Sequence, residues 1–375
     1  MLKRYAEKFL EKYVTPNKVL VLYGPRQVGK TTLVEEYLKN YKGRLYKSNG
    51  EDSNLRDILE SQEFSKIIPF FSNYDLVFID EAQKISKIGT GLKILVDQIP
   101  GIKIIATGSS SFDLSNKVGE PLVGRQWVIN LFPFALMEIN EQFGRKEIDS
   151  EINNYMIYGL YPQVFNAKSF KQKKEVLELI RDSYLYKDIV EFEGIKHSKK
   201  IFDLLKLIAF QVGSEVSIQE LGVQLGLSKN TVEKYLDLLE KTFVLFNLRG
   251  LSRNLRKEVS KKSKYYFYDN GIRNSIINNF NPIDRRDDVG QLWENFMISE
   301  RLKVIEYKKI FSNQYFWRTW DSQEIDWVEE YGGILHGYEL KYKKDKAKIP
   351  SDWEKTYEKA TYEIINKDNF DKFVL

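Results

Sequence analysis

Three short apolar runs in the N-terminal third of the chain each end in polar or small residues. The runs are Val19–Tyr23, Leu76–Ile79 and Ile102–Ala106, and segments with helical spacing of apolar residues separate them. A continuous apolar run of about four to eight residues is typical of a strand that is buried on both faces. Strands that alternate with helices predict a parallel sheet with its ligand at the carboxyl ends of the strands. This part of the chain is therefore predicted to be an α/β fold.

The first predicted strand leads directly into a glycine loop, and a helix is predicted over residues 32–39. This order suits phosphate binding, because the backbone N–H groups of the loop and the helix N-terminus face the anion. In the pattern GxxxxGK(S/T), Lys30 reaches the β- and γ-phosphates and the Thr31 hydroxyl binds Mg²⁺. A chance match is the alternative, but the flanking strand and helix argue against it. The residues expected to bind ATP here are Gly24, Pro25, Arg26, Gln27, Val28, Gly29, Lys30, Thr31 and Thr32.

An acidic pair, Asp80 and Glu81, follows the second predicted strand. Such a pair alone is often only the solvated end of a strand, but the preceding glycine loop favours a nucleotide role. Asp80 is expected to hold Mg²⁺ through water, and Glu81 to polarise the attacking water. After the third strand, Thr107 or Ser109 could sense the γ-phosphate, and the sequence leaves this choice open.

Arg125 is a candidate for the arginine that stabilises transition-state charge, in its own subunit or in a neighbouring one. An ordinary surface salt bridge is an equally good interpretation of this residue.

The middle of the chain is helical and charged, and a helix-turn-helix is predicted within it. Apolar-faced helices are expected at 201–210 and from Ser217, and Ser228 is a suitable N-cap for a third helix that takes the position of a recognition helix. Two strands, 243–248 and 264–268, would form a wing. Seven basic residues and one acid between 249 and 264 suit phosphate contact, although a solvated loop or a protein-docking module is the alternative.

A second set of acids occupies the last hundred residues. Glu294 lies on a predicted helix, Asp326 on a strand predicted at 316–328, and Glu339 and Lys341 on a strand predicted at 334–342. Alternation places the last two side chains on one face of their strand. Carboxylates from adjacent elements can hold one or two Mg²⁺ or Mn²⁺ ions, and a lysine beside them can activate water. An acid-x-lysine pair on a solvated strand is the alternative interpretation.

Composition excludes several chemistries. The 375 residues include no cysteine and only two histidines, so disulfides, thiolate catalysis and a zinc centre are not expected. No apolar run approaches the ~20 residues of a membrane span, and Met1–Thr15 does not resemble a secretory signal. We expect a cytoplasmic protein without membrane contact. The net charge of +5 is too mild to indicate nucleic acid by itself.

The most specific motifs of the chain lie at 24–31, 78–84, 106–110, 124–125 with 131–134, 184–189, 264–271 and 290–300. On these motifs the chain resembles the prokaryotic ATP-binding proteins that join an AAA+ type P-loop domain to a C-terminal DUF4143 domain. This resemblance implies an ATPase followed by a winged helix and a restriction-endonuclease-like fold of the PD-(D/E)xK group. On that template Asp326, Glu339, Lys341 and Glu294 take the nuclease positions, with Ile325 where proline is common.

Four regions are expected from these patterns: a P-loop ATPase domain at 1–138, a helical lid or linker at 139–196, a winged helix at 197–272 and a nuclease-like domain at 273–375. The resulting hypothesis is an ATPase that binds DNA and carries a metal-dependent nuclease domain. A rival hypothesis is a nucleotide-controlled switch, in which the C-terminal fold is inactive and docks a protein partner. A homo-oligomer is compatible with both.

Overall fold

The computed structural model describes residues 2–109, 122–190, 198–251, 263–319, 321–343 and 348–375. The chain divides into two compact units. The first contains Met1–Phe132 with Lys241–Phe243, and the second contains Pro133–Glu240 with Val244–Leu375.

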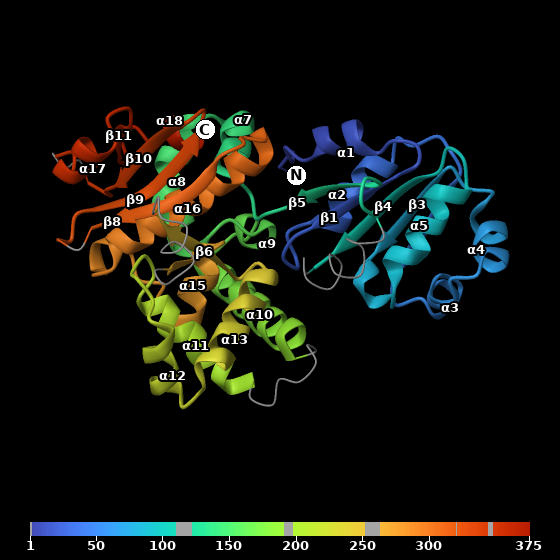
Figure 1. The fold of residues 1–375 in the computed structure, drawn as a ribbon, viewed down its shortest axis with the longest axis horizontal. Coiled ribbons are helices and arrows are strands. Elements are labelled where there is room, and N and C mark those ends of the chain that lie inside the picture. The colour runs from blue at the N-terminus through green and yellow to red at the C-terminus, as the bar shows by residue number, and fades with distance from the viewer. Residues whose placement is uncertain (1, 110–121, 191–197, 252–262, 320, 344–347) are drawn as a thin grey trace. The chain divides into compact units, whose positions relative to one another are not determined.

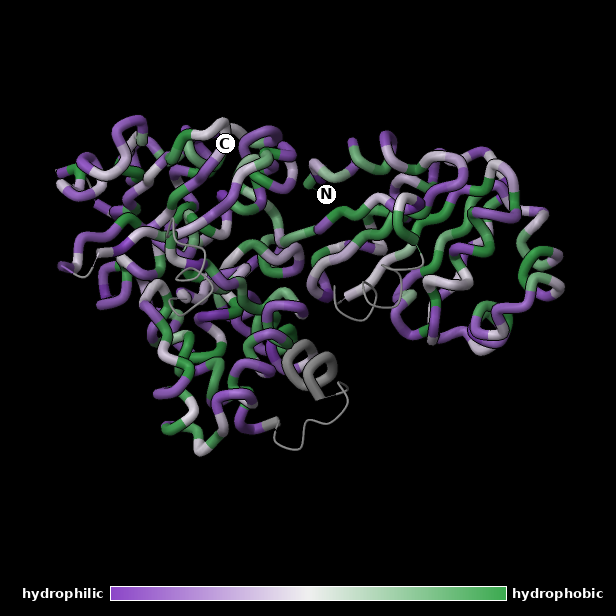
Figure 2. Tube along the Cα trace, in the orientation of Figure 1, coloured by the Kyte–Doolittle hydropathy of each residue, from purple (hydrophilic) through white to green (hydrophobic). Residues whose placement is uncertain are grey.

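The first unit is built on a five-stranded parallel sheet with the strand order β2-β3-β4-β1-β5. Its central strands are almost wholly apolar, as their green colour in Figure 2 shows, because helices cover both faces. The three strands predicted from the apolar runs, and the parallel α/β fold, are confirmed. The strands are β1 (Lys18–Tyr23), β2 (Leu45–Asn49), β3 (Leu76–Asp80), β4 (Lys103–Gly108) and β5 (Gln126–Asn130).

The helices of this unit fall into two groups that cover opposite faces of the sheet (Figure 1). Right-handed connections between parallel strands require this arrangement, because the chain first moves from β1 to the far edge and then returns. The first group is α1 (Glu7–Tyr13) and α2 (Lys30–Leu38). The second group is α3 (Ser53–Ser61), α4 (Phe64–Phe71) and α5 (Ile88–Gln98), and a short 3-10 turn, η1 (Ala82–Lys84), follows β3.

The second unit begins with helices and ends in a mixed sheet. The expected helix-turn-helix corresponds to α11 (Ser198–Phe210), α12 (Ile218–Leu225) and α13 (Lys229–Lys241). The other helices are α7 (Leu136–Phe143), α8 (Arg145–Tyr158), α9 (Pro162–Phe165), α10 (Phe170–Val190), α15 (Asn270–Ile277), α16 (Val289–Lys308), α17 (Ser351–Thr356) and α18 (Asp371–Val374), with a 3-10 turn, η2 (Ile283–Arg285). No helix within the described ranges combines the length and the apolar character that a membrane crossing requires.

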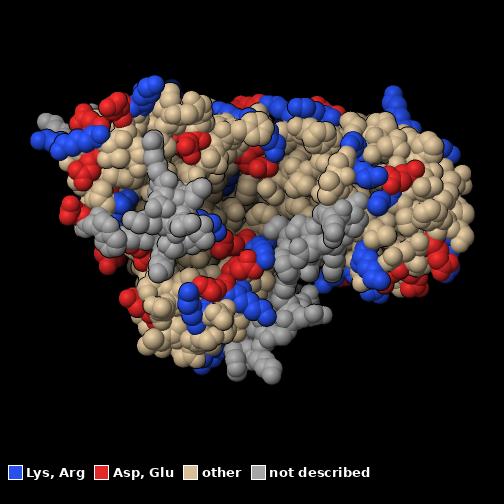
Figure 3. Space-filling model, in the orientation of Figure 1, with Lys and Arg blue, Asp and Glu red and all other residues tan. Residues whose placement is uncertain are grey.

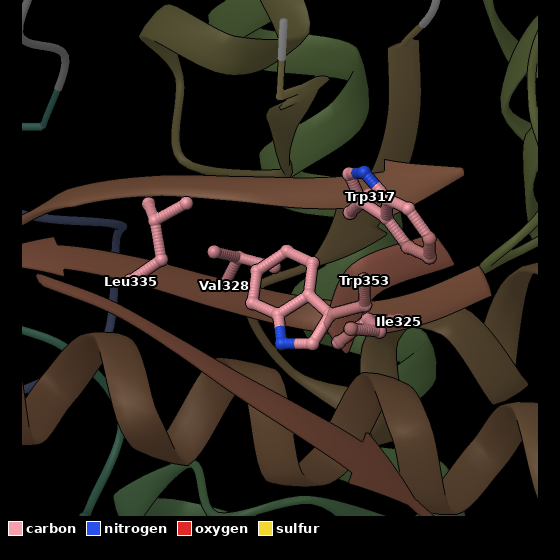
Figure 4. Close-up of a cluster of buried hydrophobic side chains, with 5 residues drawn as sticks. All are labelled: Trp317, Ile325, Val328, Leu335 and Trp353. Carbon is pink, nitrogen blue, oxygen red and sulfur yellow. The ribbon is translucent and has the colours of Figure 1, made fainter. Parts of the chain in front are cut away.

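The sheet of the second unit has six strands in the order β11-β10-β9-β8-β6-β7. Trp353 from α17 packs on one side of it against Ile325 and Val328, and its ring meets Trp317 edge to face at 5.3 Å (Figure 4). The strands are β6 (Leu245–Gly250), β7 (Ser263–Phe267), β8 (Asn313–Arg318), β9 (Glu324–Tyr331), β10 (Ile334–Leu340) and β11 (Thr361–Ile365).

Two expectations about these strands need correction. The single strand predicted at 316–328 is in fact the antiparallel pair β8 and β9, because a turn at Thr319–Gln323 reverses the chain and Ser322 adopts φ 64°. The predicted wing strands β6 and β7 do pair with each other, but they are not a separate ribbon. β6 also pairs with β8 through Arg249 and Gly250, which joins both strands to the C-terminal sheet and covers an otherwise open edge.

Candidate functional site

The glycine loop follows the carboxyl end of β1 and is shaped by two glycines. Gly24 has φ 153°, and a Cβ atom added there would lie 2.1 Å from the carbonyl oxygen of Leu131. Gly29 has φ 92°, a left-handed conformation that side chains rarely adopt, and it is the N-cap of α2. Gln27 is exposed at the tip of the loop, and Val28 is buried beneath it. The loop therefore lies directly at the positive end of a helix.

Lys30 is folded back on this loop. Its Nζ donates to the carbonyl oxygens of Gly24 at 2.8 Å and Pro25 at 2.9 Å, and the residue is only 6% exposed. The ammonium group thus lies at the mouth of the loop, where a nucleotide phosphate would compete with the two carbonyls. A charged phosphate oxygen is a stronger hydrogen-bond acceptor than a neutral carbonyl oxygen.

A hydroxyl from the loop and a carboxylate from β3 meet beside it. Thr31 Oγ1 donates to Asp80 Oδ2 at 2.9 Å, and Thr107 Oγ1, at the end of β4, donates to Asp80 Oδ1. Two hydroxyl groups from different elements therefore orient the carboxylate of Asp80. The set of hydroxyl and carboxylate oxygens fits Mg²⁺, which prefers such ligands.

Glu81 is held in an unusual backbone conformation, with φ 49°, and its N–H donates to Thr107 Oγ1 at 3.1 Å. Its carboxylate accepts a hydrogen bond from Gln83 Nε2, which also donates to Ser109 Oγ at 3.1 Å. A single amide group therefore connects the acid after β3 to the hydroxyl after β4. Sequence reasoning did not select Gln83, and only its position two residues after the acidic pair could have suggested it.

Arg125 lies at the other end of the sheet. Its carbonyl accepts from the N–H of Val19 at the start of β1, whereas the glycine loop follows the end of that strand, about 13 Å further on. Its guanidinium pairs with Asp97 of α5 at 2.6 Å. The structure thus does not bring Arg125 to the loop within one chain, and the salt-bridge interpretation describes its contacts here.

The C-terminal acids gather at one place in the second unit. Leu340 donates its N–H to Asp326 Oδ2 at 2.8 Å, and Lys341 Nζ pairs with Glu339 Oε1 at 2.8 Å. Burial together with the neighbouring charge of Asp326 raises the pKa of Glu294 to about 8 and that of Glu339 to about 7. Burial also raises the pKa of Asp326. Asp326 is therefore close enough to both glutamates to destabilise their ionised forms.

Two residues of β7 complete this cluster. Lys264 is 1% exposed, with its Nζ 3.8 Å from Glu294 Oε1 and in contact with Glu324, and Tyr266 donates its hydroxyl to Glu294 Oε1 at 2.7 Å. This corrects the expectation that Lys264 belongs to a basic stretch available for phosphate contact. Pairing of β6 with β8 carries β7 and its lysine into the C-terminal sheet. Five others of that stretch lie outside the described residues: Arg253, Arg256, Lys257, Lys261 and Lys262.

No three Asp, Glu or His side chains within the described part of the chain are arranged so that they could hold one metal ion. The ammonium groups of Lys264 and Lys341 instead neutralise part of the cluster. Glu294, Asp326 and Glu339 are thus brought together as predicted, but in a salt-bridged arrangement.

The expected recognition helix does not present a basic face. The charged residues exposed on α13 are two basic and two acidic, and Lys229 pairs with Glu233 at 3.5 Å. Figure 3 shows acidic and basic atoms mixed over the surface that α11 to α13 form. The helix therefore lacks the one-sided positive charge that commonly marks a nucleic-acid footprint.

A parallel sheet with a glycine loop after β1 and an acidic pair after β3 is the fold of a P-loop ATPase. Residues 16–140 match a family described as an AAA domain, and residues 289–368 match a domain of unknown function, DUF4143. The chain thus combines an AAA-type ATPase fold with a C-terminal DUF4143 domain. A further domain of unknown function, DUF8612, matches residues 149–282.

Similar proteins extend over most of the chain. An uncharacterized protein of Haemophilus influenzae is 25% identical over 381 residues, which covers 95% of this chain and 88% of that protein. An uncharacterized protein of Mycobacterium tuberculosis is 24% identical over 328 residues, or 86% of this chain and 70% of that protein. Among solved structures, the Thermotoga maritima RuvB Holliday junction branch migration motor matches with a TM-score of 0.32 and 16% identity, over 61% of this chain and 81% of that chain.

Proposed function

We propose that the first unit binds ATP together with Mg²⁺ and hydrolyses it. The observation that carries the proposal is the 2.9 Å hydrogen bond between Thr31 and Asp80, since it joins the glycine loop to the acidic strand end. These two residues would hold Mg²⁺, which offsets negative charge on the phosphates.

The chain's own residues supply the remaining steps. Lys30 leaves the two loop carbonyls and binds the phosphates, so that its charge stays at the mouth of the loop. Glu81 polarises the attacking water, and Gln83 orients its carboxylate. Because Gln83 also contacts Ser109, a γ-phosphate bound near Ser109 would influence the position of Glu81.

Two substitutions test binding and hydrolysis separately. Lys30→Ala removes the cation, so ATP affinity measured by calorimetry should fall sharply. Glu81→Gln keeps the shape of the acid, so the variant should bind ATP and turn over far more slowly. Lys39→Ala is a matched control, because Lys39 follows the end of the same helix and pairs only at the surface with Glu36. Unchanged ATP affinity of Lys30→Ala contradicts the proposed site.

We further propose that two of the C-terminal acids, Asp326 and Glu339, bind a divalent cation that serves DNA cleavage. Asp326 accepts a hydrogen bond from the N–H of Leu340, the residue next to Glu339, and burial together with the charge of Asp326 raises the pKa of Glu339. A cation would stabilise two carboxylates that otherwise repel each other. In this proposal the helix-turn-helix contacts the DNA. The balanced charges of α13 favour the rival hypothesis, in which the protein is a nucleotide-controlled switch that docks a protein partner.

Purified protein should be incubated with supercoiled and linear DNA, with and without ATP, Mg²⁺ and Mn²⁺. The double variant Asp326→Ala with Glu339→Ala should lose Mn²⁺ binding and cleavage while it retains ATP hydrolysis. Absence of both Mn²⁺ binding and cleavage in the parent under all conditions would support the docking fold instead.

A further inference from the structure

A buried arginine near the N-terminus contacts the backbone of the glycine loop. Arg4 is 8% exposed and lies between two other buried residues of the N-terminal segment, Leu2 and Ala6. Its Nη1 donates to the carbonyl oxygen of Val28 at 2.8 Å, and its Nη2 donates to the carbonyl oxygen of Phe132 at 2.7 Å. One guanidinium group therefore joins the N-terminal segment, the glycine loop and the end of the segment that follows β5.

The contact with Val28 determines which way the next amide points. The described part of the chain contains no cis peptide bond, so the Val28–Gly29 peptide is trans and planar. In a trans peptide the C=O and N–H bonds point in opposite directions. Because Arg4 holds the carbonyl of Val28 from one side, the N–H of Gly29 is directed to the other side. A cation on the carbonyl also polarises the peptide and makes its N–H a stronger donor.

The contact of Arg4 with Phe132 supports the start of the loop at Gly24. Leu131 donates its N–H to the carbonyl of Tyr23 at 2.7 Å, and its own carbonyl fills the space where Gly24 lacks a side chain. Arg4 binds the residue that follows. The start of the loop at Gly24 and its end at Gly29 are thus both braced by backbone that Arg4 holds.

We infer that Arg4 is a positioning residue for nucleotide binding, which presets the Gly29 amide toward the β-phosphate before ATP arrives. This inference rests on the proposed ATP site. A preset loop loses less conformational freedom on binding, so the effect of Arg4 is on affinity for the phosphates. Since the loop amide contacts the phosphate in both the ground state and the transition state, loss of Arg4 should raise KM and leave kcat nearly unchanged.

The test compares Arg4→Met with the parent. Methionine keeps an apolar stem for packing but removes all donors. We expect ATP and ADP to bind about tenfold more weakly, as is typical for loss of a hydrogen bond from a charged group. Lys3→Ala is the matched control, since Lys3 is the exposed neighbour whose side chain pairs with Glu7 at 3.8 Å, and it should bind ATP like the parent.

A spectroscopic measurement separates positioning from simple support of the fold. Labelling valine carbonyl carbon and glycine nitrogen restricts the amide spectrum to glycines that follow valine, such as Gly29. Addition of ADP with Mg²⁺ should shift the Gly29 amide strongly downfield in the parent and clearly less in Arg4→Met at saturating ADP.

The outcomes separate the two ideas. If the parent binds no ATP, the proposed function is wrong. If the parent binds ATP and Arg4→Met shows the same affinity and the same Gly29 shift, the role of Arg4 is wrong while the ATP site stands. Should Arg4→Met fail to fold, Arg4→Lys decides. This variant keeps the charge but not the two-pronged contact, so weaker ATP binding at an unchanged melting temperature supports the inference, and unchanged binding overturns it.

Discussion

Replacement of Lys264 by methionine would remove a buried cation from among carboxylates. Lys264 is 1% exposed, its Nζ lies 3.8 Å from Glu294 and contacts Glu324, and it sits 5.2 Å from the ring centre of Phe316. Loss of one partner of a buried ion pair typically costs about 3 to 5 kcal/mol. Glu294 adds little to this cost, because burial raises its pKa to about 8 even beside Lys264, and the group is therefore largely protonated at neutral pH. We therefore expect the free energy of unfolding to fall by an amount near the lower limit of this range, about 3 kcal/mol.

For a unit of this size, 1 kcal/mol corresponds to about 2 to 4 °C in melting temperature, so the Lys264→Met variant should unfold about 6 to 12 °C below the parent. Circular dichroism would follow the thermal transition. Lys309→Met is the control, because Lys309 pairs with Glu306 at 2.9 Å at a half-exposed site, where a pair contributes less than about 1 kcal/mol.

Mn²⁺ extends the same experiment. If the carboxylates can accept a cation, Mn²⁺ should raise the melting temperature of Lys264→Met more than that of the parent, because the ion takes over the charge that the lysine supplied. A melting temperature equal to that of the parent would refute the reasoning about the buried pair. A destabilised variant that Mn²⁺ does not affect would refute the cation site.

Three further predictions concern single features. Gly24→Ala should abolish ATP binding measured by calorimetry without unfolding the protein, because the added Cβ would lie 2.1 Å from the Leu131 carbonyl and displace the loop; normal affinity would show that the loop tolerates a side chain. Arg125→Ala should lower the free energy of unfolding by less than about 1 kcal/mol, and a loss of ATP turnover that depends on protein concentration would reveal a role in a neighbouring subunit. Without metal, the folded state raises the pKa of Glu339 to about 7 and that of Glu294 to about 8, from the ordinary value of 4.5 in the unfolded chain. Above pH 4.5 the two groups therefore keep protons in the folded state that they release in the unfolded state. Their contribution to the free energy of unfolding is therefore complete below pH 4.5 and is lost as the pH rises through 7 and 8. Urea unfolding that shows a constant or rising free energy of unfolding between pH 4.5 and 8 would contradict this prediction.

The sequence alone was enough to predict the parts of the proposed ATP site that are local in the chain. A strand, a glycine loop and a helix are contiguous, so their residue types and spacing encode the phosphate cradle without knowledge of the fold. The acidic pair after β3 is similarly marked by the apolar strand that precedes it. The rule that parallel strands present their carboxyl ends at one edge then correctly predicted that Asp80 would lie near Thr31.

Only the tertiary structure decided which distant residues join these sites. Arg4 contacts Val28 and Phe132, which lie 24 and 128 positions further along the chain, and Lys264 contacts Glu324, 60 positions further along. No local sequence pattern encodes such pairs. The sequence made Arg125 a candidate for the arginine that stabilises transition-state charge, but strand direction places it at the opposite end of the sheet. The burial of Lys264 depends on β6 pairing with β8, and strand pairing is determined by which edges are left open in the folded chain, a property that exists only once the sheet has formed.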